Sequence, residues 1–188
     1  MQKAKEEVLK WTREISEYRT PSWESLPQIP LYLDQVVSFL ETQLKDLLQD
    51  ENEKTITPSM INNYVKKKVI PPPIKKKYDV HHLARLLAIH TSKQILPISQ
   101  ISKFLNQFLV EEKTQEVLEE YRQKQDQALH SVAQRLGAEL ESCPPQELEE
   151  MLRGLVLEFV LQANSMRMAA ECIIDALPEQ SRHKEKKS

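Results

Sequence analysis

Glycine is scarce in this chain, with two residues among 188, against eleven prolines. Glycine is the usual occupant of positive φ, which tight turns and phosphate-binding loops require. So little glycine cannot supply the turns of a β-sandwich, a dinucleotide-binding loop or a P-loop. The composition therefore excludes these large classes of fold and enzyme.

Cysteine is equally rare, and its spacing excludes two kinds of site. Cys143 and Cys172 lie far apart, with no CxxC motif and no neighbouring histidine. This pattern rules out a disulfide framework and a recognisable zinc site, and it fits a reducing compartment.

Long apolar runs are absent too. The N-terminal stretch MQKAKEEVLKW alternates lysine and glutamate where a signal peptide needs apolar residues, and no uncharged apolar run reaches about 18 residues. We therefore expect a soluble, cytoplasmic protein that does not enter a membrane. Because no predicted helix brings together a nucleophile, a base and an orienting acid, we expect neither an enzyme nor a cofactor or metal.

The net charge of −2 conceals a strong asymmetry along the chain. Residues 1–53 hold 6 basic and 11 acidic side chains, residues 54–110 hold 10 and 1, and residues 111–188 hold 10 and 16. Clustered lysine and arginine attract polyanions over about a Debye length, whatever the total charge. The middle segment therefore predicts a polyanionic partner.

Apolar residues recur at helical spacing through the first part of the chain. They predict helices over residues 2–19, Leu31 to about Gln49, 58–68, 80–94, and a further one that Pro97 opens. The stretch TPSWESLPQIP should be an ordered, non-helical connection, with Trp23, Leu26 and Ile29 holding it against a core. Pro30 should then open the second helix.

Two helix starts have a local mechanism. Thr57 and Asp79 each supply an N-cap acceptor, and Pro58 suits the first helical position because it has no N–H to leave unpaired. The run VIPPP ends the helix over residues 58–68, since a residue before proline is disfavoured in the α region.

The rest of the chain predicts two long helices, over about 112–140 and 145–177, and a disordered tail over 178–188. The LVLEFVL stretch of the second helix is apolar on nearly all sides, which indicates burial at a bundle centre or in a subunit interface. Helices of this length exceed the small module they pack on, so we expect a homodimer. A monomer, with the second helix at the centre of one compact bundle, is the alternative.

Four blocks of sequence occur together: Leu26-Pro27, LYLDQV from Leu31 to Val36, SMINNYVK over 59–66, and PPPIKKKY over 71–78. Together they resemble an uncharacterised bacterial family of small proteins, a domain of unknown function numbered 1836. The resemblance covers about residues 20–110. It implies membership of that family and no particular activity.

A second pattern consists of Ile61 and Tyr64, the exit Val69-Ile70-Pro71, Lys76, Tyr78, Leu83 and Leu86, and Ile98 and Ile101. It resembles the winged helix-turn-helix of MerR-class transcription regulators. The resemblance implies a recognition helix over 58–68, a basic wing over 71–78 and two following helices. Two features depart from the class: Lys68 stands where it has glycine, and residues 41–56 are much longer than its tight turn.

The basic segment itself favours nucleic acid, with a solvated lysine face, and a polar surface pair at Asn62-Asn63, as the alternatives. From Lys54 to Lys77 there are seven lysines and no acidic residue, in clusters on either side of a proline-rich connector that can reach separate phosphates. Asparagine on the outer helix face can bond to adenine in the major groove. The candidate DNA-binding residues are Thr57, Ser59, Asn62, Asn63, Lys66, Lys67, Lys68, Lys75, Lys76 and Lys77.

Other residues have structural interpretations. We expect Tyr64 and Tyr78 to be core or wing anchors, and His81 and His82 to be exposed after the Asp79 cap. Cys143 should lie beside a helix cap. We expect burial in the core for Cys172, Met151, Met166 and Met168.

The sequence thus predicts an all-α protein. A winged-helix-like DNA-binding domain over residues 20–110, preceded by the helix over 2–19, would be followed by a helical oligomerisation or sensing region over 111–177. The predicted function is a transcription regulator that binds double-stranded DNA as a homodimer. The alternative is a non-catalytic module that docks an acidic protein through the same lysines.

Overall fold

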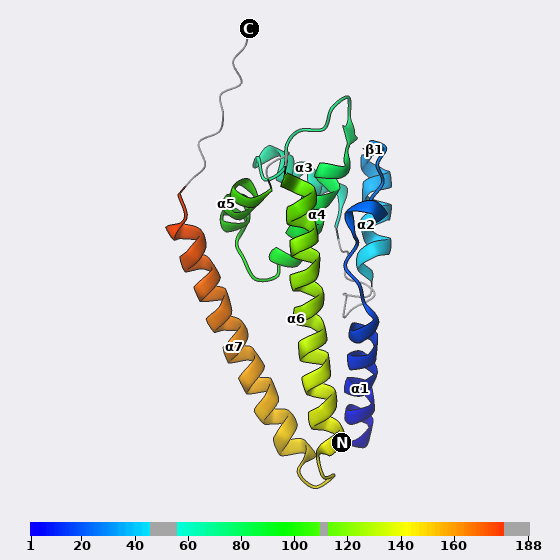
Figure 1. Ribbon diagram of the computed structural model, residues 1–188, viewed down its shortest axis with the longest axis vertical. Helices are drawn as coiled ribbons and strands as arrows, with labels where there is room; N and C mark the ends of the chain where they lie inside the picture. Colours follow the sequence, from blue (N-terminus) through cyan, green and yellow to red (C-terminus); the bar gives the residue numbers. More distant parts are fainter. Residues whose placement is uncertain (46–55, 110–112, 179–188) are drawn as a thin grey trace.

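The computed structural model describes residues 1–45, 56–109 and 113–178, and these ranges are almost entirely helical (Figure 1). The helices are α1 (Gln2–Glu17), the 3-10 turn η1 (Trp23–Ser25), α2 (Leu33–Leu44), α3 (Pro58–Lys66), α4 (Val80–Ser92), α5 (Ile98–Phe108), α6 (Thr114–Ser142) and α7 (Leu148–Ala176). Two short strands, β1 (Leu31–Tyr32) and β2 (Lys77–Tyr78), pair antiparallel. The all-α prediction is confirmed, with this small sheet as an addition.

The main core surrounds α4. Nine of the thirteen residues of this helix are buried, because α2, α3, α5 and α6 all contribute side chains to the same cluster. Leu40 of α2, Ile61 of α3 and Leu105 of α5 are each 0% exposed. Burying a side chain of this size contributes about 1.5–3 kcal/mol, so this cluster is the main source of stability.

The connection between α1 and α2 is ordered and non-helical apart from η1, as predicted. Leu26 is buried and Trp23 packs on the core, but Ile29 is 71% exposed, so its predicted contact is wrong. Pro30 opens no helix, because Leu31 and Tyr32 extend to pair with β2 and α2 begins only at Leu33. The predicted continuation of this helix to Gln49 lies outside the described residues.

Acidic side chains of α6 hold this connection in place. Asp126 Oδ1 accepts the backbone N–H of Thr20 at 2.9 Å, and Glu119 Oε1 accepts that of Trp23 at 3.0 Å. The bond from Trp23 lowers the pKa of Glu119; burial opposes the shift and Arg122 adds to it. The N-terminal segment is therefore fixed along α6, beside which α1 runs in Figure 1.

The two long helices form as predicted, but α7 is not the centre of a bundle. Figure 1 shows it diverging from α6. At one end Leu148 and Leu155 pack with Leu140 of α6, and at the other Asp175 pairs with Lys103 of α5 at 2.7 Å. Between these ends α7 is largely exposed, because α4 already fills the centre. The alternative that places this helix at the centre of a bundle is therefore wrong about its position.

The same exposure overturns three smaller predictions. Met166 and Met168 are 69% and 57% exposed and Cys172 is exposed, since all three lie on the splayed part of α7. Met151 is half-buried, and Cys143 is the C-cap residue of α6, beside a helix end as predicted. Among the described residues, no helix is long and apolar enough to cross a membrane.

A side-chain cap fixes the start of α4. Asp79 Oδ1 accepts the backbone N–H of His82 at 3.1 Å, and His82 Nδ1 lies 2.6 Å from the same oxygen. His82 is only 3% exposed, so its predicted exposure is wrong: its ring turns back over the cap and packs edge-on against Tyr78. Burial by itself would raise the pKa of Asp79, but the hydrogen bonds and charge of His82, with the charge of His81, lower it.

Replacing Asp79 with alanine removes this cap and should lower the free energy of unfolding by about 1 kcal/mol in urea titrations. Asp79→Asn keeps an acceptor oxygen and should retain most of that stability. The lowered pKa of Asp79 means that its charge stabilises the fold above the unfolded-state value of 3.8, and that this stabilisation is lost as the pH falls through the folded value. The difference between wild type and Asp79→Asn should therefore shrink below about pH 4. Equal losses in the two variants would contradict the capping role.

Candidate nucleic-acid interface

The outer face of α3 is polar and exposed. Thr57 Oγ1 accepts the N–H of Met60 at 3.2 Å and Pro58 opens the helix, as predicted. Ile61 and Tyr64 then face the core at 0% and 6% exposure. The residues left on the exposed side are Ser59, Asn62, Asn63 and Lys66. Thr57 itself is half-buried and serves as the cap.

The exit of α3 is a Schellman motif built without glycine. The N–H of Lys68 bonds to Val65 O at 3.0 Å and that of Val69 to Tyr64 O at 2.9 Å, which pairs two carbonyls at the helix end. Lys68 stands in the left-handed region, with φ of 57°. Buried Tyr64 and Val69 pack at the two ends of the motif, so the core holds the backbone in this form.

The basic stretch beyond VIPPP forms a tight hairpin. Ile74 and Lys77 exchange two backbone hydrogen bonds, of 3.0 and 2.9 Å, and the turn between them consists of Lys75 and Lys76. These have φ of 50° and 64°, the left-handed pair of a type I′ turn, where Asn-Gly is usual. β2 continues from the hairpin onto β1, with Tyr32 opposite Lys77.

Lysine therefore occupies every non-glycine position with positive φ in the described part of the chain. Each costs about 1–2 kcal/mol relative to right-handed backbone. The hairpin shows that a tight turn forms here without glycine. Lysine occupies the positions where glycine is usual, and the backbone there is strained. Strain of this kind persists only where surrounding structure enforces it, and it collects at functional sites.

The lysines of this region lack acidic partners among the described residues. No described residue forms an ion pair with Lys66, Lys67, Lys68, Lys75 or Lys76, and all five are exposed. Lys77 is half-buried, with its ammonium 4.9 Å from the centre of the Tyr32 ring. Several cations elsewhere are paired, as Arg122 is with Glu119 and Arg135 with Glu158.

The predicted site residues lie at one end of the molecule. Figure 1 shows α3 and the hairpin together at the end opposite the N-terminus and the α6–α7 turn. Sequence reasoning missed the role of β1, which holds the hairpin against α2, and the burial of His82 beneath it. Within the described ranges, no group of three or more histidine, cysteine, aspartate or glutamate side chains could hold a metal ion.

Comparison with protein families gives a match. The model of a family described as a domain of unknown function (DUF1836) matches residues 21–127. The matched segment contains the α2–α5 core, the α3 exit, the hairpin and the first part of α6, and it leaves α1 and α7 outside. No curated protein and no solved structure matches the chain.

Lys68→Gly tests whether the α3 exit stores strain. Glycine adopts positive φ without a steric penalty, so the free energy of unfolding should rise by up to about 1 kcal/mol. Lys67→Gly is the matched control, because Lys67 has φ of −82° and glycine there should cost about 0.5–1 kcal/mol. Urea unfolding of both variants makes the comparison. Equal destabilisation by both would show that no strain is stored at Lys68.

Proposed function

The chain belongs to this family of domains of unknown function, and we propose that it is a DNA-binding transcription regulator with a winged helix-turn-helix related to the MerR class. The observation that carries the proposal is the use of exposed, unpaired lysines at the three strained backbone positions. Glycine or asparagine would relieve that strain, but neither carries a cation. A polyanionic partner gives a physical reason for lysine there.

In the proposed complex, α3 enters the major groove of duplex DNA. Asn62 and Asn63 are the candidate base-reading residues, because an exposed asparagine amide can donate to and accept from adenine. Ser59 lies one turn earlier on the same exposed side. The lysines at the α3 exit and hairpin tip would bind the phosphate backbone and fix the register of the helix.

We further propose that the regulator pairs through α7. Its outer face carries Val156, Leu157, Val160 and Leu161, each at least 61% exposed, and monomers rarely expose so large an apolar patch. Near α1, four apolar residues, Met1, Leu152, Val156 and Leu157, help to line a groove of about 420 Å³ that continues this patch.

A second copy of the chain would bind more favourably to this face of α7 than to the charged faces of the molecule. From Gly154 to Met166 the only charged residue is Glu158, which bonds to Arg135 of α6. Such a surface does not repel its own copy across a two-fold axis, whereas the lysine-bearing end of the molecule would. A dimer would also present two copies of α3 to two half-sites at a fixed spacing.

A two-residue replacement tests the DNA interface without loosening the hairpin. Lys75→Asn combined with Lys76→Gly installs the pair that type I′ turns prefer, so stability should hold or rise. Duplex affinity should fall, and the slope of log K against log salt should flatten by about two units, at about 0.9 per lost phosphate contact. Salt-titrated binding to short duplex DNA measures both.

The matched control removes two exposed lysines elsewhere, Lys10 of α1 and Lys124 of α6, as a double alanine variant. It should leave the salt slope nearly unchanged. If both variants change the affinity and the salt slope equally, DNA binding depends on net charge and not on the hairpin lysines. If wild type fails to bind duplex DNA at low salt, the acidic-protein alternative takes the place of this proposal.

The dimer is tested by sedimentation at micromolar concentration. Leu157→Glu combined with Leu161→Glu places charges on the outer face of α7 and should convert the dimer to a monomer with unchanged helix content. Ile29→Glu is the control, since Ile29 is 71% exposed and lies outside α7. A single 21.9 kDa species for the wild type would end the dimer proposal.

A further inference from the structure

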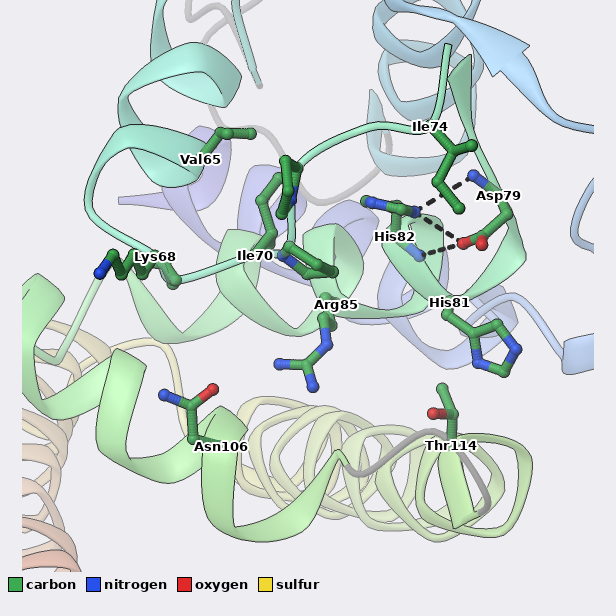
Figure 2. A pocket seen from close by; sticks show the side chains of 13 residues that line it. Val65, Lys68, Ile70, Ile74, Asp79, His81, His82, Arg85, Asn106 and Thr114 are labelled. Carbon is green, nitrogen blue, oxygen red and sulfur yellow. Dashed lines mark hydrogen bonds and ion pairs between the residues drawn. The ribbon is translucent and has the colours of Figure 1, made fainter. Parts of the chain in front are cut away.

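A cavity of about 570 Å³ lies beneath the exit of α3. Its lining comes from the α3 exit, the proline turn, the hairpin, the first turns of α4, and single residues of α5 and α6 (Figure 2). This volume is within the range of small-molecule pockets, which run from about 300 to 1,000 Å³. The cavity thus joins the two lysine-bearing elements of the candidate interface.

The cavity has apolar walls and a few polar groups. The walls include Val65, Ile70, Pro71, Pro72 and Ile74. Opposite them, Figure 2 shows Arg85 projecting from α4 toward the side where Asn106 lies. Such a combination suits a ligand with an apolar body and one polar end.

Two buried side-chain atoms in the lining, His81 Nδ1 and His82 Nε2, form no hydrogen bond with any described residue, and His82 is the more deeply buried of the two residues. His82 is only 3% exposed, and its Nε2 forms no hydrogen bond with any described residue. The other ring nitrogen, Nδ1, is engaged by Asp79, at 2.6 Å from Oδ1 and 3.2 Å from the backbone nitrogen. Because a buried polar atom without a partner is costly, Nε2 marks the point where a ligand atom would bind.

The hydrogen-bonding of His82 is compatible with an oxygen anion as that atom. Nδ1 lies 2.6 Å from Asp79 Oδ1, and a contact of this length to a carboxylate requires Nδ1 to be the donor. Nε2 is then an acceptor in the neutral ring and a donor in the doubly protonated ring, so an anion at Nε2 binds the doubly protonated form. Among the charged residues of the lining, Lys68 and Arg85 are cationic, and Asp79 is the one carboxylate, with Oδ1 already bonded to His82.

We propose that this cavity binds a small organic anion, with its carboxylate at His82 Nε2 and its apolar body against the proline turn. The binding site does not depend on DNA. Its regulatory consequence does rest on the proposed function: a ligand that contacts both the α3 exit and Ile74 would fix the recognition helix relative to the hairpin and so change DNA affinity.

Three probes of similar shape and different charge test the site: benzoate, benzyl alcohol and benzylammonium. Titrations of the full-length protein, followed by backbone amide NMR shifts, should show saturable changes at Lys68, Ile70, Ile74 and His82 with benzoate. Benzyl alcohol should bind at least about tenfold more weakly, because a charge-assisted hydrogen bond is lost. Benzylammonium should not bind. No saturable shift with benzoate, or equal binding of the three probes, overturns the proposal.

His82→Asn separates the two ring nitrogens, because the asparagine side chain ends near the position of Nδ1 and cannot replace Nε2. Benzoate affinity should fall by about tenfold or more while the capping of α4 is kept. His130→Asn is the control, since this histidine of α6 lies outside the cavity lining. If NMR shows that the His82 variant is folded and it binds benzoate as tightly as wild type, the assignment of His82 Nε2 as the binding atom is wrong.

Duplex DNA titrations with and without saturating sodium benzoate, at constant ionic strength, test the consequence. A change of at least about threefold in affinity supports coupling of the two sites. An unchanged affinity overturns the coupling, and the anion site is then judged by the NMR result alone. Failure to bind DNA in either condition contradicts the proposed function, which keeps the two failures distinct.

Discussion

Burial of α4 is the constraint on which the other elements depend. Its apolar residues contact neighbours on almost every side, so α2, α3, α5 and α6 are each placed by the face of α4 they cover. The cap at Asp79 and His82 fixes where this helix begins, directly after β2. The hairpin therefore leaves the core at a defined point, although only two residue pairs join β2 to β1.

Helical periodicity predicted most of this architecture, because it records which side of a helix is apolar. It placed Ile61 and Tyr64 inward and Asn62, Asn63 and Lys66 outward, but it wrongly placed Lys68, which is exposed, on the inward side. It did not predict β1, since two residues are too few for an alternating pattern and their pairing partner lies far along the chain. It also misplaced α7: a pattern shows that an apolar face needs a partner but not whether the same chain supplies one.

The candidate site was predictable in composition and not in conformation. Seven lysines without an acid are visible in the sequence, and the exposure of Lys66, Lys75 and Lys76 follows from the helix face and the hairpin. Left-handed backbone is normally signalled by glycine or asparagine, and lysine gives no such signal at Lys75 and Lys76. At Lys68 the resemblance gave one, because the MerR class has glycine at that position. The burial of His82 could not be predicted either, because it depends on Tyr78 and on the fold of the hairpin above it.

α7 is attached to α6 over its first half and to α5 near its C-terminal end. The first attachment consists of the apolar contact of Leu148 and Leu155 and the ion pair of Glu158 with Arg135, and the second is the ion pair of Asp175 with Lys103. A continuous helix of 29 residues, about 43 Å long, is a stiff rod, and its connection to α6 runs through Pro144-Pro145. It therefore bridges α6 and α5, and loss of the α5 ion pair would leave this long helix held by its contacts with α6 alone.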